Sequence, residues 1–505
     1  MNDVLVVGAG PVGMTMAAEL ARFGLRVRVV DKNAARTDKS KALVIWARTL
    51  ELMDRMGEGV VERFVAAGMK VEDAFIFAGR EEIAHVNLGT IDSPHKYVLM
   101  IAQSETERLL EQELKRRGVL VERQVELVEF DEGDDSVMCT LRHADGSLEK
   151  VETKWLAGCD GAHSTVRHAL GMSFDGSTML DDWLLADLHL TGMPDPAAIR
   201  IHWHADGVLT LFPLGGTRFR VIADVGQSQT SSEIGEGNRP APTLDKVQRI
   251  LDIRGPGGVV ASDAVWLSSF SINERKVKTY RGGRAFLAGD AAHVHSPAGG
   301  QGMNTGMQDA FNLAWKLAMV ERGLAAPEVL LASYSEERSA VAKLVLEATG
   351  KATAMAVAQG GLKQSIRNHV ASMIFGFAPV QHTVANVLSE IAVSYGASAL
   401  NESYGFGLAA PEAGKRAPIR EGDVPVGAGQ TPRFVLFADD AEVYAELKEQ
   451  YGVILEGTVR APFAQGALWL VRPDGYVGLR AKAGDVEAVR GYLNRVTRPM
   501  VAAIA

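Results

Sequence analysis

The apolar residues of the first 31 positions fall into two short runs separated by a helical pattern. Val4–Val7 is a continuous apolar run, which is typical of a strand buried on both faces of a sheet. The segment from Met14 to Ala21 spaces its apolar residues as a helix does, and the stretch RVRVVD at 26–31 predicts a second strand. The N-terminus is therefore predicted to form a strand, a helix and a strand, the opening unit of an α/β fold.

Further along the chain, the pattern predicts more strands. WLAGCDG at 155–161 and RAFLAGD at 284–290 are short apolar strands that each end near a glycine and an aspartate. Between them, residues 180–270 contain runs with partial alternation, separated by glycine, proline and aspartate turns; these runs are WLLADLHL, AIRIHWHA, VLTLFPLG and RFRVIADV. This pattern favours an antiparallel sheet inserted into the α/β domain.

The last third of the chain changes character twice. After Val320 the apolar spacing is mainly helical up to Leu400, and residues 401–432 are rich in glycine and proline. A length of 505 residues predicts two or three domains. We expect a discontinuous α/β domain with a helical extension at 1–178 and 271–400, an inserted β-sheet domain at 179–270, a linker at 401–432 and a small α/β domain at 433–505.

The amino-acid composition limits the kinds of molecule that this protein is expected to bind. With 47% apolar and 23% charged residues the chain is typical of a globular protein, and its net charge of −9 offers no basic surface for nucleic acid or anionic lipid. No uninterrupted apolar run reaches transmembrane length. Cys139 and Cys159 are too few for a disulfide framework and wrongly spaced for structural zinc. We expect a cytoplasmic monomer or homodimer that binds small molecules, not nucleic acid or membranes.

The first strand leads directly into the motif GAGPVG at 8–13. Gly8 allows a tight turn, Gly10 lets a pyrophosphate approach the backbone, and Gly13 lets helix and strand pack closely. Asp31, at the end of the second strand, is placed to accept a hydrogen bond from a ribose hydroxyl. The motif predicts a dinucleotide but leaves FAD and NAD as alternatives, since both use it.

A second glycine-rich stretch, GDAAHVHSPAGGQGMNTG, occupies residues 289–306. Pro297 fixes the course of this segment, Gly299 and Gly300 let the backbone come close to a flat ring, and a helix is predicted to begin near Gln301. A flexible surface loop is the alternative, but it does not explain this order of residues.

Three motifs in sequence, GAGPVG at 8–13, CDGAHSTVR at 159–167 and GDAAHVHSPAGGQGMN at 289–304, resemble those of the class A FAD-dependent aromatic hydroxylases, the p-hydroxybenzoate hydroxylase-like flavoprotein monooxygenases. The resemblance spans most of residues 1–340. It implies a Rossmann-like FAD-binding domain with an inserted antiparallel-sheet substrate domain. The segment AGKRAP at 413–418 and the tail resemble the aromatic polyketide and phenol hydroxylase branch, which carries a C-terminal thioredoxin-like domain.

The resemblance implies FAD as the cofactor and NAD(P)H as a transient co-substrate. The first motif would hold the ADP half of FAD, Asp290 the ribityl chain, and the second motif would handle both FAD and NAD(P)H. The cofactor-binding residues implied in this way are Gly8, Gly10, Pro11, Val12, Gly13, Asp31, Lys32, Arg48, Gln103, Asp160, Gly289, Asp290, Pro297, Gly300, Gly302, Met303 and Asn304. For Arg48, an exposed position on a helix is the alternative.

The implied reaction is hydroxylation of an aromatic substrate, phenolic or polycyclic and polyketide-like. NAD(P)H reduces FAD, O2 forms a flavin C4a-hydroperoxide, and the hydroperoxide transfers oxygen to the ring. No side chain attacks the substrate, so no catalytic residue is predicted; Phe212, Pro213 and Pro297 are candidate substrate contacts. The alternatives are an FAD-dependent dehydrogenase or reductase of a small hydrophobic substrate, and a non-catalytic flavin-binding protein.

Several histidines could be taken for functional residues. Arg200, His202 and His204 share one face of a predicted strand, but no clear carboxylate or thiolate partner completes a metal site, and we expect no metal. His293 and His295 flank the third motif, and we expect neither to transfer a proton.

Two positions depart from the family. Leu43 stands where the phenol hydroxylases carry an activating aspartate, and His163 stands where the family often has arginine. The first departure removes a phenol-activating acid, and the second weakens the inference about NAD(P)H.

Overall fold

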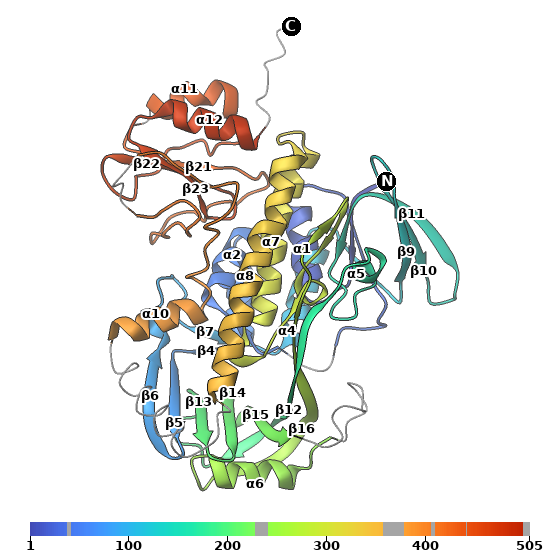
Figure 1. Cartoon of the computed structure of the whole chain (residues 1–505), viewed down its shortest axis with the longest axis vertical. Coiled ribbons are helices and arrows are strands. Elements are labelled where there is room, and N and C mark those ends of the chain that lie inside the picture. Colours follow the sequence, from blue (N-terminus) through green and yellow to red (C-terminus); the bar gives the residue numbers. More distant parts are fainter. Residues whose placement is uncertain (38–41, 228–240, 357–377, 406–409, 441, 498–505) are drawn as a thin grey trace.

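The structure is a computed structural model that describes residues 1–37, 42–227, 241–356, 378–405, 410–440 and 442–497. The chain forms three regions along its long axis (Figure 1). The N-terminal α/β region lies in the middle, a large β-sheet lies at one end, and the C-terminal region lies at the other.

The central region is built on an eight-stranded sheet. Its main path is, in spatial order, β17 (Arg281–Gly282), β18 (Ala285–Leu287), β11 (Leu148–Gly158), β1 (Asn2–Val7), β2 (Val27–Asp31) and β8 (Val121–Arg123). The strands from β18 to β8 are parallel, and the antiparallel strands β9 (Glu126–Glu132) and β10 (Val137–Arg142) extend β11. The predicted N-terminal strand, helix and strand are confirmed as β1, α1 (Pro11–Arg22) and β2.

The helices of this region pack against one another beside the central sheet. α1 packs against α7 (Gly302–Glu321) and α4 (Gln103–Arg116), and α7 packs against α8 (Pro327–Ala356). Nearly every residue of α7 is buried, since it lies between other elements on more than one side. A short helix α5 (Thr165–Ala169) follows β11.

A second eight-stranded sheet contains the antiparallel strands predicted within 179–270. Its order is β19 (His293–Val294), β16 (Val260–Lys276), β12 (Asp175–Thr191), β15 (Arg218–Gln227), β14 (Gly207–Gly215), β13 (Ile199–His204), β5 (Asp73–Ala78) and β6 (Glu81–Asn87). Helix α6 (Leu244–Arg254) packs on one face, where Leu209, Leu211 and Phe219 are buried. The hairpin of β5 and β6 joins from much earlier in the chain, which the predicted boundaries did not anticipate.

A small sheet connects the two large ones. It pairs β3 (Val44–Ile45), β7 (Val98–Met100) and β4 (Met69–Val71). Around it lie short helices, namely α2 (Ala47–Met53), η1 (Asp54–Met56), α3 (Val60–Ala67), η2 (Leu88–Thr90) and α10 (Ala378–Leu388). The chain from β3 into α2 therefore runs from the interior towards the C-terminal region.

The C-terminal region has a four-stranded sheet with two helices. The sheet order is β20 (Glu402–Ser403), β23 (Val477–Lys482), β22 (Ala467–Val471) and β21 (Val435–Phe437), and the helices are α11 (Glu442–Tyr451) and α12 (Val486–Val496). The segment predicted as a linker contributes β20, which is parallel to β23, and its Ala417 N–H donates to the Gly475 carbonyl. The described residues of 401–432 therefore form part of this region as well as connecting to it.

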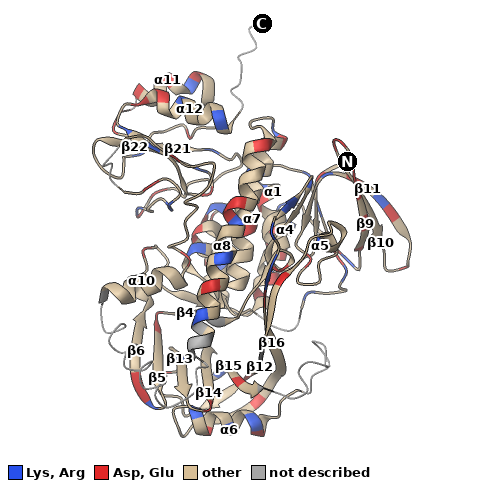
Figure 2. Cartoon of the chain, in the orientation of Figure 1, with Lys and Arg blue, Asp and Glu red and all other residues tan. Residues whose placement is uncertain are grey.

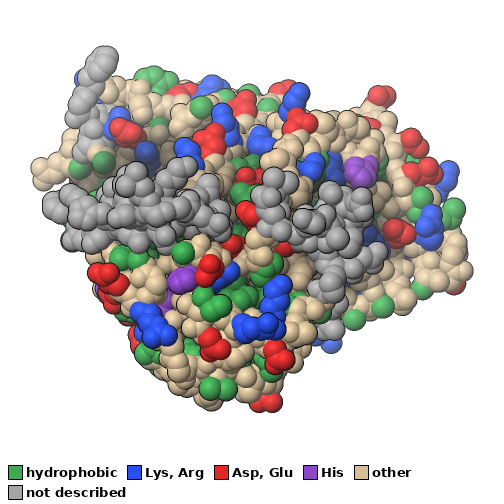
Figure 3. All heavy atoms as spheres, turned by 60° about the horizontal axis from the view of Figure 1, so that its bottom comes forward, with side chains coloured by type: hydrophobic (Ala, Val, Ile, Leu, Met, Phe, Trp, Pro, Cys, Tyr) green, Lys and Arg blue, Asp and Glu red, His purple; other side chains and the backbone are tan. Residues whose placement is uncertain are grey.

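The surface carries both signs of charge in every region. Figure 2 shows Lys and Arg interspersed with Asp and Glu along the helices and strands, and the face in Figure 3 likewise mixes both signs with apolar side chains. Neither view shows the broad basic patch that nucleic-acid binding would require. Within the described ranges, no helix has both the length and the apolar character needed to cross a membrane.

Candidate functional site

A first cavity of about 650 Å³ lies where β1, β2 and β11 end. Carboxyl ends of parallel strands are the usual position of ligand sites in α/β sheets. The cavity is lined by Val7, Gly8, Gly10, Asp31, Lys32, Asn33, Val125, Glu126, Leu127, Cys159, Asp160, Gly161 and Thr165.

The three glycines of the first motif are needed for different structural purposes. A Cβ on Gly8, whose φ is +97°, would lie 2.4 Å from the Cys159 carbonyl oxygen, and one on Gly13 would lie 1.9 Å from the Gly8 oxygen. A Cβ on Gly10 would meet nothing within 4 Å. Gly8 and Gly13 are therefore required by packing, whereas Gly10 keeps space open at the start of α1, whose first turn has neither a side-chain cap nor an acidic residue. Free N–H groups with open space before them suit a phosphate.

Two aspartates form the walls of the first cavity. The Asp31 carboxylate accepts hydrogen bonds from the Ala9 N–H at 2.7 Å and the Asn33 N–H at 2.8 Å. In Asp160, Oδ2 accepts from the Val166 N–H at 3.2 Å, while Oδ1 is buried without a hydrogen-bond partner among the described residues. A buried carboxylate oxygen left in this way is suited to accept from a ligand hydroxyl or N–H group.

A second cavity, of about 1270 Å³, adjoins the first and shares Gly10, Cys159 and Gly161 with it. It lies between the central sheet, the β3 segment and the second large sheet. It is lined by Gly10, Pro11, Val12, Ala42, Leu43, Val44, Gln103, Cys159, Gly161, Phe212, Arg220, Ile222, Ala288, Asp290, His295, Ser296, Pro297, Gly300, Gly302 and Met303. One continuous ligand could therefore extend from the first cavity into the second.

The glycine-rich stretch forms one wall of the second cavity through η3 (Gly289–Ala291), residues 295–297 and η4 (Ala298–Gly300). A Cβ on Gly300, where φ is +64°, would lie 2.4 Å from Cγ2 of Val44. The predicted helix begins here as α7, again without a side-chain cap or an acid in its first turn. Its positive end therefore faces this wall.

Comparison with known proteins identifies the family of this chain. The model of the FAD binding domain family matches residues 1–349. The chain is 35% identical to 6-methylpretetramide 4-monooxygenase from Streptomyces rimosus, over 97% of this chain and 93% of that protein. It is also 35% identical to rifampicin monooxygenase from Streptomyces venezuelae, over 78% of this chain and 80% of that protein.

The chain belongs to the FAD-dependent aromatic hydroxylases. Among solved structures, the aromatic hydroxylase CabE from angucycline biosynthesis superposes with a TM-score of 0.76 at 30% identity, covering 98% of this chain and 99% of that one. The resemblance inferred from the three motifs is confirmed, and so is the expectation of FAD.

The residues present fit FAD. Gly10 leaves room for a diphosphate at a helix N-terminus, the unpartnered oxygen of Asp160 lies in the same cavity, and the adjoining cavity accommodates a larger ring. Of the predicted cofactor-binding residues, those lining the first cavity are Gly8, Gly10, Asp31, Lys32 and Asp160. Those lining the second are Gly10, Pro11, Val12, Gln103, Asp290, Pro297, Gly300, Gly302 and Met303.

Four predicted cofactor residues line neither cavity. Gly13 and Gly289 serve packing, since a Cβ on Gly289 would lie 2.8 Å from Cγ2 of Val12. Asn304 is fully buried, accepts from the Trp46 N–H at 2.8 Å and donates to the Val44 and Gly300 carbonyls at 3.0 Å. In this hydroxylase Asn304 thus ties the glycine loop to β3 behind the cavity wall.

Arg48, the fourth, points away from the cofactor cavities. It is 1% exposed, donates to Glu51 Oε2 at 3.0 Å and to the Asp474 carbonyl at 2.9 Å, and lies over the Tyr476 ring. Both the predicted cofactor contact and the alternative of an exposed helix arginine are therefore corrected. The physical reason is that the C-terminal region covers this side of α2, so that Arg48 joins the two regions.

Two of the three candidate substrate residues line the second cavity. Phe212 and Pro297 are in its wall, but Pro213 is not. Neighbouring residues of a strand point to opposite faces, and Pro213 therefore lies on the buried face of β14 away from Phe212.

The two histidines of the glycine-rich stretch lie in different surroundings. His293 is 1% exposed, with Nε2 2.8 Å from Asp309 Oδ2, and it lines neither cavity. His295 does line the second cavity; its Nδ1 lies 2.9 Å from the Ser296 carbonyl oxygen, and its Nε2 is buried without a partner among the described residues. Burial, together with His293, lowers the pKa of His295 to about 4, so its ring is neutral near pH 7.

The predicted histidine pair of β13 forms no metal site. His202 is fully buried, stacks on Phe77 and has Nδ1 3.1 Å from the Gly79 carbonyl oxygen, while His204 lies 3.3 Å from Asp206. No group of three or more His, Cys, Asp or Glu side chains among the residues in the structure could hold a metal ion.

Sequence reasoning missed Arg220, which is 1% exposed and lines the second cavity. Its Nε and Nη2 donate to the two oxygens of Asp187 at 2.7 and 2.8 Å. Arg220 and Leu43 also line a third cavity of about 1380 Å³, so these residues separate two adjoining spaces. The alternation of polar and apolar residues in RFRVIADV places Arg220 on one face of a strand. It does not indicate that Asp187 on β12 is the partner of Arg220.

Proposed function

We propose that the chain hydroxylates a phenolic or polycyclic, polyketide-like aromatic substrate with FAD, NAD(P)H and O2. The observation that carries the proposal is the pair of adjoining cavities, one open at the start of α1 and one bounded by the second sheet. The name 6-methylpretetramide 4-monooxygenase, given to a relative that matches nearly the whole chain, supports this substrate class.

Backbone and side-chain groups at fixed positions in the two cavities would bind the cofactor. When bound, FAD supplies the redox chemistry that uses electrons from NAD(P)H and delivers one oxygen atom of O2 to the substrate. The N–H groups at the start of α1 bind its diphosphate, Asp31 and Asp160 accept from its hydroxyl or N–H groups, and Asp290 holds the ribityl chain. The N-terminus of α7 stabilises negative charge on the ring system without any side-chain movement.

The wall formed by the second sheet would hold the substrate. Phe212, Ile222 and Leu43 offer apolar contacts that exclude water from the reacting ring. Since Nδ1 of His295 donates to the Ser296 carbonyl, its Nε2 carries the lone pair and can accept a hydrogen bond from a substrate hydroxyl. His295 would then orient a phenol in a chain that has Leu43 where the phenol hydroxylases have an aspartate.

NAD(P)H would dock transiently. The chain has a single GxGxxG motif, at 8–13, and hence no second fingerprint for a separate nicotinamide domain. We also propose that the C-terminal region is thioredoxin-like and acts in packing; it has no cysteine between residues 401 and 505, so it has no thiol redox activity.

The test is a substrate screen with the flavin-loaded protein. Phenols and anthraquinone-type polycyclic compounds should stimulate NADH or NADPH oxidation, and the product should contain one added oxygen atom. Stimulated oxidation that yields a product without added oxygen would instead indicate a dehydrogenase or reductase. Bound flavin with no stimulation by any aromatic compound would indicate a non-catalytic flavin-binding protein.

A further inference from the structure

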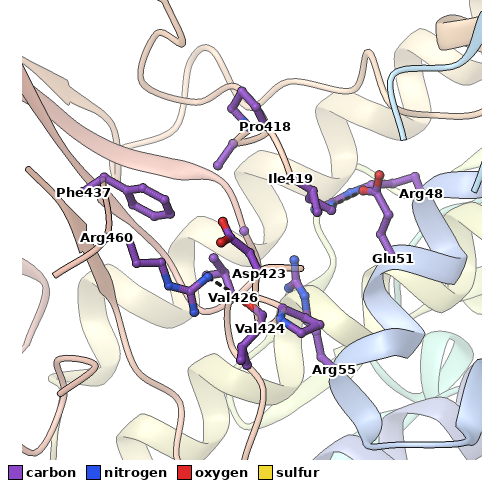
Figure 4. A pocket seen from close by; sticks show the side chains of 13 residues that line it. Arg48, Glu51, Arg55, Pro418, Ile419, Asp423, Val424, Val426, Phe437 and Arg460 are labelled. Atoms are coloured by element: carbon purple, nitrogen blue, oxygen red, sulfur yellow. Dashed lines mark hydrogen bonds and ion pairs between the residues drawn. The ribbon is translucent and has the colours of Figure 1, made fainter. Parts of the chain in front are cut away.

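A separate pocket of about 400 Å³ lies between the central and C-terminal regions, away from both cofactor cavities. It is lined by Arg48, Glu51, Arg55, Ala417, Pro418, Ile419, Asp423, Val424, Pro425, Val426, Phe437, Arg460 and Gly475. Figure 4 shows Arg48, Glu51 and Arg55 on the N-terminal side, facing the segment that carries Ile419 and Val424.

Arg55 in this pocket has a buried charge without a carboxylate partner. It is only 4% exposed, and Nη1 donates to the Pro473 carbonyl at 3.0 Å. Its Nε is buried without a hydrogen-bond partner, and no ion pair joins Arg55 to an acidic side chain among the residues that the structure describes. The guanidinium therefore keeps unused donors at a site with little access to bulk water.

Three of the other charged groups of the pocket, Arg48, Glu51 and Arg460, already form ion pairs. Glu51 pairs with Arg48 at 3.0 Å and with Arg416 at 2.5 Å, and Arg460 pairs with Glu456 at 2.7 Å. These pairs leave no buried carboxylate of the pocket for Arg55. Asp423 also lines the pocket, but it is exposed, and it forms no ion pair within the described part of the chain.

The buried ion pairs around the pocket carry an excess of positive charge. Lys316 pairs with Glu337, and Arg472 pairs with Glu337 and Asp474, all of them buried. With the pocket's own charged groups and their partners this gives six cations, namely Arg48, Arg55, Arg416, Arg460, Lys316 and Arg472, against five carboxylates, namely Glu51, Glu337, Asp423, Glu456 and Asp474. Burial, followed by repulsion from Arg48, lowers the pKa of Arg55 to about 9, and the attraction of Asp474, Glu51 and Glu19 does not offset these two effects.

An unpaired buried charge is strongly destabilising, and an anion would remove this penalty. Arginine donates in a planar fork that matches an oxyanion, and two arginines with unpartnered Nε atoms, Arg48 and Arg55, line the same pocket. Apolar Phe437 and Val426 also line the pocket.

We propose that this inter-domain pocket binds a small inorganic oxyanion, of the phosphate class, at Arg55 and Arg48, and that the bound anion strengthens the contact between the C-terminal and FAD-binding regions. The proposal is independent of the substrate and of the hydroxylation chemistry. It concerns stability and domain contact, so it can be tested on the flavin-loaded protein without turnover.

The test compares the wild type with Arg55→Met in chloride-free buffer, with inorganic phosphate titrated at constant ionic strength. The thermal midpoint of the wild type should rise along a saturable curve by about 2–4 °C, as a ligand specific for the folded state would raise it. In Arg55→Met the saturable rise should disappear. Without phosphate the variant should be at least as stable as the wild type, because its substitution removes an uncompensated buried charge.

Arg142→Met is the matched control, since Arg142 is half-exposed on β10, far from the pocket, and should keep the wild-type response. Phosphate also stabilises proteins by exclusion from their surface, but that effect does not saturate and would be equal in all three proteins. An equal response in wild type and Arg55→Met would overturn the proposal. So would a variant that is less stable than the wild type by the same amount with and without phosphate.

Discussion

Replacement of Gly10 by serine should weaken cofactor binding without reducing the stability of the fold. Gly10 has φ −78° and ψ −177°, an extended conformation that serine adopts readily, and a Cβ there meets nothing within 4 Å. Serine is also a better N-cap than glycine by a few tenths of a kcal/mol, so the flavin-free variant should be as stable as the wild type or slightly more so.

The same side chain should interfere with FAD. Its Cβ and Oγ would occupy the space before α1, and the Oγ would accept from the N–H groups that bind a diphosphate. Loss of one charge-assisted hydrogen bond costs about 1.5–3 kcal/mol, which corresponds to roughly 10–100-fold weaker binding. Titration of the flavin-free protein with FAD, followed by flavin fluorescence, measures this loss, and thermal unfolding of the same sample measures stability.

Gly13→Ala serves as the contrasting variant. Its Cβ would lie 1.9 Å from the Gly8 carbonyl oxygen, whereas real Cβ atoms essentially never approach within 3.0 Å, so the strand and helix would have to separate by about 1 Å. This variant should lose stability even without FAD. Unchanged FAD affinity in Gly10→Ser would refute the assignment of the first cavity.

Three further variants test other parts of the structure. Burial raises the pKa of Glu390 to about 7, above its value in the unfolded chain. The free energy of unfolding of the wild type should therefore fall by up to ~3 kcal/mol between pH 5 and pH 7 and then level off. Glu390→Gln should remove this pH dependence in thermal unfolding, and a pH dependence that persists in the variant would reject the assignment to Glu390. His293→Gln should lower the free energy of unfolding by about 1–3 kcal/mol, as seen by denaturant titration, yet leave the pH profile of turnover unchanged, because His293 contacts Asp309 and not the cavities; a shifted profile would make His293 a proton-transfer group. Phe212→Ala should raise KM for the aromatic substrate about tenfold without weakening FAD binding. Pro213→Ala changes a residue on the opposite face of the strand and should alter stability but not KM. Equal effects of the two variants on KM would contradict the placement of Phe212 in the cavity wall.

The parts of the fold that were predicted correctly depend on local sequence. β1, α1 and β2 follow from an apolar run, a glycine motif and helical spacing within 31 residues, and the start of α7 near Gln301 follows from the glycine loop before it. Such signals need no knowledge of distant partners.

The parts that were missed depend on contacts between distant segments. DAFIFA at 73–78 is a short apolar run, but nothing local indicates that β5 pairs in parallel with β13. All seven residues of α2 are buried, so periodicity could not show that Arg48 faces the C-terminal region. Asn304 has the polarity of a ligand contact, yet its partners are backbone groups of β3 and the glycine loop.

The central claim, that this aromatic hydroxylase transfers oxygen from O2 to a ring bound beside FAD, is tested most directly by isotope labelling. The flavin-loaded protein, NAD(P)H and a stimulating aromatic compound are incubated under 18O2, and the product is analysed by mass spectrometry. We expect one 18O atom in each hydroxylated product molecule. A product that contains no 18O, or whose new oxygen comes from labelled water, would contradict it.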